Sequence, residues 1–351
     1  MRAVRWHGRH DVRHETVPDA PPPGPRQVRL AVEWCGLCGT DLLEYRAGPI
    51  EIPTSEHPVT GHAAPVILGH EVSGRITDVG DGVGEGVNGG LRAGDLVALN
   101  ALIPCGDCAI CRSGAYHRCP DFGHIGMSAD GGLAELLTVP VQMVVRAPAG
   151  LDPALAALAE PFAVAWHLVR RVEPPPGRRV SIVGAGSIGL ACALILRAEG
   201  HEVTVVDVGD ERLAVPRALE LPTRRADQDP PTGVADLAVD ATGTGPGFAL
   251  ACAVTRPGGT VGLAGLPGEP VPFDVADAAK RELTLVGSMS HRTTADLRPA
   301  LDFLARHTDQ AAALITKRVR LADTVPQGLD ILAGAERGRH IKILVTPGGT
   351  L

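Results

Sequence analysis

The sequence predicts an α/β protein with two domains, one rich in β-strands and one with a doubly wound parallel sheet. Its 351 residues are enough for about two domains, each with its own core. Up to about residue 150, short β-rich runs alternate with turns rich in proline and glycine, such as APPPGP. From Val180 onward, β-rich and helical segments alternate, which is typical of βαβ units and a parallel sheet.

The β-rich first part is expected to be antiparallel, and its pattern changes around Leu151. A helical segment then runs from Asp152 to Arg170, and the motif EPPPGRR interrupts the chain before the parallel sheet begins. The strands expected in the first part are Gln27–Trp34, Val72–Val79, Asp95–Leu99, Leu133–Val139 and Met143–Ala147.

The second part is expected to alternate strand and helix up to about residue 290. A helix at Ala295–Arg306 and a last strand at Lys342–Val345 follow it. The expected strands of the parallel sheet are Val180–Val183, Glu202–Asp207, Leu237–Asp240, Thr260–Ala264 and Leu283–Ser288, with helices ending at Glu199 and near Glu211–Glu220 and Phe248–Thr255.

Charge and composition exclude several classes of function. The net charge of −7 provides no basic surface for nucleic acid or for an anionic membrane, so we expect a small-molecule partner. The charged start MRAVRWHGRHDVRHE is unlike a signal peptide, and the most apolar stretch, Val180–Ala198, is interrupted by glycines and polar residues. Four of the eight cysteines fall in one cluster, which fits a reducing compartment, and we expect a cytoplasmic protein.

A cluster of four cysteines predicts a structural zinc site. The run PCGDCAICRSGAYHRC spaces its thiols so that one loop, at about residues 100–120, can arrange them tetrahedrally around Zn²⁺. Four thiolates leave no open position, so this zinc would hold the lobe together without taking part in chemistry. Incidental cysteines or a redox cluster are the alternatives, and two disulfides in so short a run would be strained. The predicted ligands are Cys105, Cys108, Cys111 and Cys119.

A glycine-rich motif predicts a dinucleotide site in a Rossmann domain. Gly184, Gly186 and Gly189 form the pattern G-x-G-x-x-G directly after an apolar strand and at the start of a helix. Asp207 ends the next strand, where a carboxylate accepts hydrogen bonds from the adenine ribose and repels a 2′-phosphate, so NAD(H) is expected rather than NADP(H). The alternative is an ordinary glycine-rich helix start with a surface aspartate. Ser187, Ile188 and Arg212 complete the candidate cofactor-binding residues.

Three separated motifs contain candidate ligands for a second, catalytic metal. Cys38 lies in CGLCGTD, His70 and Glu71 lie in LGHE, and Glu160 lies in AEPFAVAWH. Taken singly, each is better explained by structure alone: Cys38 as a small buried residue, His70 as a core histidine and Glu160 as an acid in the first turn of a helix. Their combination with the cysteine cluster and the dinucleotide motif favours a metal site.

These motifs, in this order, resemble the zinc-dependent medium-chain alcohol dehydrogenases over essentially the whole chain. The insert HPVTG and the segment EPFAVAWH are most similar to the 2,3-butanediol dehydrogenase branch, with the sorbitol dehydrogenases close by. The resemblance implies a GroES-like catalytic domain (1–150, completed by 290–351), a Rossmann domain (151–289), two zinc ions per chain and NAD(H). It also implies a homo-oligomer, either a dimer or a tetramer.

Carried onto this chain, the resemblance assigns roles at the catalytic zinc. Cys38 and His70 would bind the metal, with Glu71 and Glu160 alternating as the carboxylate ligand. Zinc would polarise an alcohol oxygen while hydride passes to the nicotinamide, and Thr40 would begin the proton relay.

The expected reaction is NAD-dependent oxidation of a secondary alcohol, with a vicinal diol such as 2,3-butanediol as first candidate. A polyol, sugar-alcohol or specialised cyclic-alcohol dehydrogenase is the alternative. A non-catalytic zinc- and NAD-binding module is the alternative of a different class. A zinc-free reductase is disfavoured by the presence of all four candidate ligands, Cys38, His70, Glu71 and Glu160.

One position departs from the family pattern and generates a prediction. The residue five positions after Cys38, a histidine in the relay of this branch, is Leu43 here, and leucine cannot carry a proton. We expect Leu43→His to raise kcat at neutral pH, measured as the initial rate of NADH formation. An unchanged or lower kcat would contradict the relay argument.

Overall fold

The computed structural model describes residues 1–84, 90–228 and 232–348, and the chain divides into two compact units. The first unit contains Met1–Glu160, His291–Thr308 and Ile315–Leu351, and the second contains Pro161–Ser290 and Asp309–Leu314. The domain boundaries expected from the sequence, after residues 150 and 289, stay a prediction. In the structure, the chain passes from one compact unit to the other after Glu160 and after Ser290.

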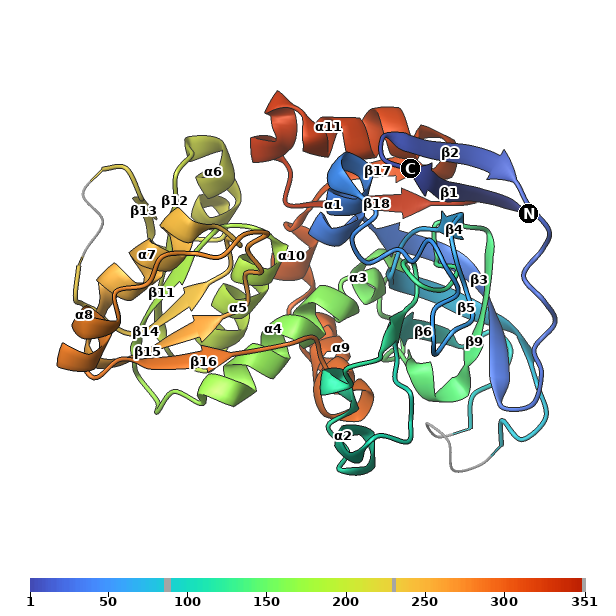
Figure 1. Cartoon of the computed structure of the whole chain (residues 1–351), viewed down its shortest axis with the longest axis horizontal. Helices are drawn as coiled ribbons and strands as arrows, with labels where there is room; N and C mark the ends of the chain where they lie inside the picture. The colour runs from blue at the N-terminus through green and yellow to red at the C-terminus, as the bar shows by residue number, and fades with distance from the viewer. Residues whose placement is uncertain (85–89, 229–231, 349–351) are drawn as a thin grey trace. The chain divides into compact units, whose positions relative to one another are not determined.

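The first unit is built on β-sheets that are largely antiparallel (Figure 1). One sheet has the order β2-β1-β4, a second has the order β10-β6-β5-β3-β18-β17 with β9 also paired to β3, and β7 pairs with β8. The strands are β1 (Arg2–Gly8), β2 (Asp11–Thr16), β3 (Gln27–Gly36), β4 (Val66–Ile67), β5 (Glu71–Val79), β6 (Leu96–Leu99), β7 (Leu102–Ile103), β8 (Gly123–His124), β9 (Leu136–Pro140), β10 (Val144–Arg146), β17 (Ile315–Arg320) and β18 (Lys342–Thr346).

Strand β3 is the centre of the larger sheet. Val28, Leu30 and Val32 alternate along it and point into the core, as expected for a strand with one buried face. At its end, Gly36 lies opposite Glu71 of β5 on one side and Leu344 of β18 on the other. The register therefore brings the start of β5 and the start of β18 next to the residues that follow β3.

The helices of the first unit are short. They are α1 (Gly39–Ala47), α2 (Ala109–Arg112), α3 (Pro153–Ala157), α9 (Arg298–Arg306) and α11 (Asp330–Ala333), with 3₁₀ turns at Tyr116–Arg118, Val141–Met143, Leu321–Asp323 and Ala335–Arg339 and π-helical turns at Thr293–Leu297 and Val325–Leu329.

The second unit contains a parallel sheet with the order β13-β12-β11-β14-β15-β16, which is the doubly wound order expected of a Rossmann fold (Figure 1). The prediction of an α/β protein with such a sheet is confirmed. Its elements are α4 (Ala159–Val172, whose first two residues belong to the first unit), β11 (Arg179–Val183), α5 (Ser187–Ala198), β12 (Glu202–Asp207), α6 (Asp210–Ala218), β13 (Thr223–Arg225), β14 (Ala235–Asp240), α7 (Gly245–Val254), β15 (Thr255–Leu263), α8 (Val275–Lys280), β16 (Thr284–Gly287) and α10 (Thr308–Ala312, which begins at the last residue of a first-unit segment).

Some elements differ from the sequence-based expectation. The single helix expected over Asp152–Arg170 is two helices, α3 and α4, separated at Leu158. A proline lies in the first turn of each, at Pro153 and Pro161, where its missing N–H costs no helical hydrogen bond. The strands β1, β2, β13 and β17 and helix α1 were not predicted.

The described residues contain no helix with the length and apolar character needed to cross a membrane.

Close packing in the second unit predicts the effect of one substitution. A Cβ added at Gly189 would lie 1.9 Å from the backbone oxygen of Gly184, so helix and strand would have to separate. We expect Gly189→Ala to lower the free energy of unfolding by about 1–3 kcal/mol, measured by urea denaturation. The control is Gly268→Ala, because nothing lies within 4 Å of the added Cβ there. Equal stability of the two variants would contradict this packing.

Candidate functional site

The end of β3 and the start of β5 bring together a cluster of metal-binding side chains. Cys38 precedes the first residue of α1, His70 directly precedes β5, and Glu71 is the first residue of β5. One ligand atom from each of the three side chains lies within 4.8 Å of the others. The structure therefore places three of the four predicted ligands in one group that could hold a metal ion.

Two further charged residues surround this cluster, and sequence reasoning gave neither of them a role. Asp41, fully buried on α1, accepts a hydrogen bond from the Cys38 N–H at 2.9 Å and lies 3.9 Å from His70 Nδ1. Lys342, the first residue of β18, donates to Glu71 Oε1 at 2.5 Å and to the Leu37 carbonyl at 3.0 Å. Burial alone would lower the pKa of Lys342, but the attraction of Glu71, Cys38 and Glu160 together outweighs it and raises that pKa.

The close approach of Glu71 explains the glycine at position 36. A Cβ at Gly36 would lie 1.9 Å from Glu71 Oε2, while Lys342 holds the other carboxylate oxygen. Gly36 therefore leaves the space that the Glu71 side chain occupies.

Several buried polar atoms of the cluster have no hydrogen-bond partner within the described residues. They are Asp41 Oδ1, His70 Nδ1 and Glu71 Oε2. A buried polar atom without a partner costs about 1–3 kcal/mol. Asp41 Oδ1 and His70 Nδ1 face each other at 3.9 Å, so Glu71 Oε2 is the atom that a cation between Cys38, His70 and Glu71 would satisfy. The donor set of one thiol, one imidazole and one carboxylate fits Zn²⁺.

The fourth predicted ligand, Glu160, lies in the first turn of α4 and is buried. Its Oε1 is 3.6 Å from His291 Nδ1. Burial raises the pKa of Glu160 to about 7. Thr40, the predicted start of the relay, has its hydroxyl 3.6 Å from Cys38 Sγ, whereas the side chain of Leu43 is exposed to solvent.

The four cysteines of the predicted structural zinc site also lie together. Their sulfur atoms are within 4.8 Å of one another, with Cys119 and Cys111 Sγ 3.4 and 3.8 Å from Cys105 Sγ. All eight cysteines of the chain are free thiols, so the alternative of two disulfides does not occur. Cys108 precedes α2, and a hydrogen bond from the Cys111 N–H lowers the pKa of the Cys108 thiol to about 7, which favours the thiolate that a metal binds.

The glycine motif of the second unit has the geometry of a dinucleotide site. Gly184 has φ 104°, a conformation that favours glycine, and Gly186 precedes α5, which begins with Ser187 and Ile188. Asp207 ends β12, and its carboxylate accepts from the N–H groups of Ala185 and Val208, both at 2.7 Å. The N–H groups at the start of α5 are available to a phosphate, and Arg212 lies on α6.

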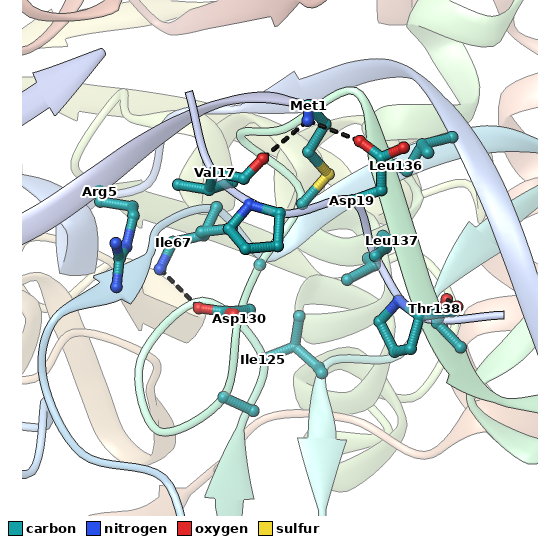
Figure 2. A pocket seen from close by; sticks show the side chains of 15 residues that line it. Met1, Arg5, Val17, Asp19, Ile67, Ile125, Asp130, Leu136, Leu137 and Thr138 are labelled. Carbon is teal, nitrogen blue, oxygen red and sulfur yellow. Dashed lines mark hydrogen bonds and ion pairs between the residues drawn. The ribbon is translucent and has the colours of Figure 1, made fainter. Parts of the chain in front are cut away.

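A pocket of about 330 Å³ in the first unit is separate from these groups (Figure 2). Figure 2 shows the amino group of Met1 bonded to the Val17 carbonyl and to Asp19, and Asp130 bonded to the Ile67 N–H. None of the predicted ligands lines this pocket. Because its labelled polar groups are already paired, it does not compete with the cysteine–histidine–glutamate cluster as a candidate active site.

Comparison with known proteins agrees with this geometry. Residues 24–149 match the alcohol dehydrogenase GroES-like domain, and residues 187–306 match the zinc-binding dehydrogenase family. The chain is 31% identical to the (R,R)-butanediol dehydrogenase of Bacillus subtilis over 99% of this chain and 100% of that protein. It is 34% identical to the L-galactonate-5-dehydrogenase of Escherichia coli over 77% of this chain and 78% of that one.

The crystal structure of the 2R,3R-butanediol dehydrogenase from Bacillus subtilis superposes with a TM-score of 0.89, at 29% identity and 99% coverage of both chains. The predicted oxidoreductase activity and the predicted zinc and nicotinamide dinucleotide cofactors are confirmed at the level of the family. The chain belongs to the zinc-dependent medium-chain alcohol dehydrogenases and is an alcohol or polyol dehydrogenase.

Proposed function

We propose that this enzyme interconverts a secondary alcohol and its ketone with NAD as the hydride acceptor, and that a vicinal diol such as 2,3-butanediol is the substrate. The observation that carries the proposal is the buried group of Cys38, His70 and Glu71, whose ligand atoms lie within 4.8 Å of one another. Similarity to butanediol dehydrogenases over nearly the whole chain supports the diol.

In this proposal Cys38 and His70 hold the catalytic zinc, together with Glu71 or Glu160. When bound, the zinc supplies a Lewis acid that favours loss of the alcohol proton. Lys342 engages one oxygen of Glu71, which leaves Oε2 as the oxygen free to face the metal. Cys105, Cys108, Cys111 and Cys119 hold the second zinc, which keeps their lobe folded.

The proton leaves the site through this chain's own polar groups. Thr40 lies beside Cys38, where its hydroxyl can accept a proton from the substrate and pass one on. When Glu71 holds the metal, Glu160 is a second buried carboxyl that can take up or release a proton. Leu43 adds nothing to this path, because its side chain is apolar.

The second unit supports NAD over NADP. Two backbone N–H groups orient the carboxylate of Asp207 at the end of β12. Arg225 lies opposite Asp207 in the register of the neighbouring strand β13. Its guanidinium donates hydrogen bonds to the carboxylates of Asp227 and Asp210. The carboxylate of Asp207 would repel the 2′-phosphate of NADP, and the guanidinium of Arg225 is already bonded to two other carboxylates.

The second candidate is a polyol or sugar-alcohol dehydrogenase, which the 34% identity to an L-galactonate-5-dehydrogenase favours. In either case we propose that the protein is a homo-oligomer, a dimer or a tetramer. Membership of the chain in a family of dehydrogenases argues against the alternative of a different class, a non-catalytic zinc- and NAD-binding module.

The test is the rate of NADH formation by zinc-replete protein on separate stereoisomers of 2,3-butanediol, on sorbitol and on simple secondary alcohols. We expect highest kcat/KM on one butanediol stereoisomer, little activity with NADP, and loss of turnover in zinc-free protein that still binds NADH. Highest kcat/KM on sorbitol would favour the second candidate. Turnover by fully demetallated protein, or none by zinc-replete protein on any alcohol, would contradict the proposal.

A further inference from the structure

The loop after α1 carries a carboxylate, Glu51, whose position is set by the buried acid Glu44. The Glu44 carboxylate accepts the backbone N–H groups of Ile50, Glu51 and Ile52. Glu44 itself is 1% exposed and lies on α1, the helix that begins directly after Cys38. The backbone of Glu51 is therefore fixed relative to the helix that follows a predicted metal ligand.

The side chain of Glu51 reaches toward the metal cluster through His124 of β8. Glu51 Oε2 is 3.9 Å from His124 Nδ1, which is longer than a hydrogen bond. The ring of His124 in turn lies against that of His70, with 4.8 Å between their centroids. The pair formed by Glu51 and His124 thus lies one ring away from the Cys38–His70–Glu71 cluster.

The two polar groups of this pair are too far apart to hydrogen-bond to each other, and both can bond to a third group. His124 Nδ1 is buried and has no hydrogen-bond partner within the described residues. The Glu51 side chain is 45% exposed, so it can be reached from solvent. An imidazole nitrogen can exchange a hydrogen bond with a neutral polar group.

A hydroxyl group can be this third group. It donates to the Glu51 carboxylate, which only accepts, and its lone pair accepts from the imidazole Nδ1–H. A carbonyl oxygen lacks the hydrogen for Glu51, and a carboxylate or phosphate would be repelled by it. The other carboxylates beside the cluster, Asp41, Glu71 and Glu160, add to this repulsion, and Lys342 is already paired with Glu71.

We infer that Glu51 and His124 bind a second hydroxyl of the substrate, next to the carbinol that reacts at the metal cluster. The substrate class is then a neutral vicinal diol or polyol, and sugar acids and sugar phosphates are excluded. This inference rests on the proposed function, because it places the reacting carbinol at Cys38, His70 and Glu71. It makes Glu51 the specificity-determining residue for the second hydroxyl.

The test compares 2,3-butanediol with 2-butanol, which differ by this one hydroxyl. In Glu51→Leu we expect kcat/KM on the diol to fall about tenfold or more while kcat/KM on 2-butanol stays within about threefold, because one hydrogen bond to a charged group is lost. Glu51→Gln keeps an acceptor oxygen, so we expect its kcat/KM on the diol to lie between the values of the wild type and of Glu51→Leu. Glu56→Leu, an exposed acid in the same loop, is the matched control and should leave both values unchanged.

A second readout does not depend on turnover. Binding of 2,3-butanediol to the enzyme–NADH complex, followed by NADH fluorescence, should weaken about tenfold in Glu51→Leu with the zinc content unchanged. An unchanged diol preference and unchanged diol binding in Glu51→Leu would overturn the inference. So would an equal fall on both alcohols, or a wild-type preference for L-galactonate over neutral polyols.

Failure of this inference and failure of the proposed function give different results. If the wild type oxidises neither alcohol, the proposed reaction is wrong, and the binding measurement still decides whether Glu51 holds a diol. If the wild type oxidises both and Glu51→Leu keeps its diol preference, the reaction stands and the role of Glu51 is wrong.

Discussion

The buried ion pair between Lys342 and Glu71 is the interaction on which the candidate active site depends. Lys342 is 2% and Glu71 1% exposed, and they come from strands that lie on either side of β3. Removing one partner of such a pair leaves a buried charge and costs about 3–5 kcal/mol. The C-terminal segment that carries β18 is therefore part of the site, which explains why the first unit is completed by residues so distant in the sequence.

This ion pair also limits how the remaining charges can be balanced. Lys342 compensates Glu71, but Asp41 is fully buried beside His70 and Cys38, and Glu160 is buried nearby. Cys38, Asp41 and Glu160 together carry more potential negative charge than one lysine can neutralise. A divalent cation between Cys38, His70 and Glu71 would balance the excess and give Glu71 Oε2 a partner, so its binding would stabilise the fold as well as serve catalysis.

The cysteine lobe is connected to the same region by a polar network. The Tyr116 hydroxyl accepts from the Thr293 N–H at 2.6 Å, and the Asn100 side chain donates to the Thr293 hydroxyl at 2.7 Å. Tyr116 lies between Cys111 and Cys119, and Thr293 is two residues after His291, the neighbour of Glu160. This network joins the lobe to the segment that contacts Glu160, so a zinc ion that orders the lobe would also order that segment.

Sequence reasoning succeeded where the signal is local. The glycine motif and the alternation after Val180 predicted the Rossmann sheet, and the cysteine spacing predicted a cluster that the structure brings together. The sequence did not predict β1 and β2, because their charged side chains hide the strand pattern. It gave no role to Lys342, because Lys342 comes close to Glu71 only when β5 and β18 both pair with β3.

The zinc content of Cys38→Ser, compared with that of the wild type, tests whether the Cys38–His70–Glu71 cluster binds metal. If each of the two clusters holds one zinc ion, wild-type protein should contain about two zinc ions per chain and the variant about one, with the Cys105–Cys119 site retained. The melting temperature of the variant should fall as well, because the buried acids lose their counter-ion. A variant that keeps the wild-type zinc content and melting temperature would contradict the assignment of the metal to Cys38, His70 and Glu71.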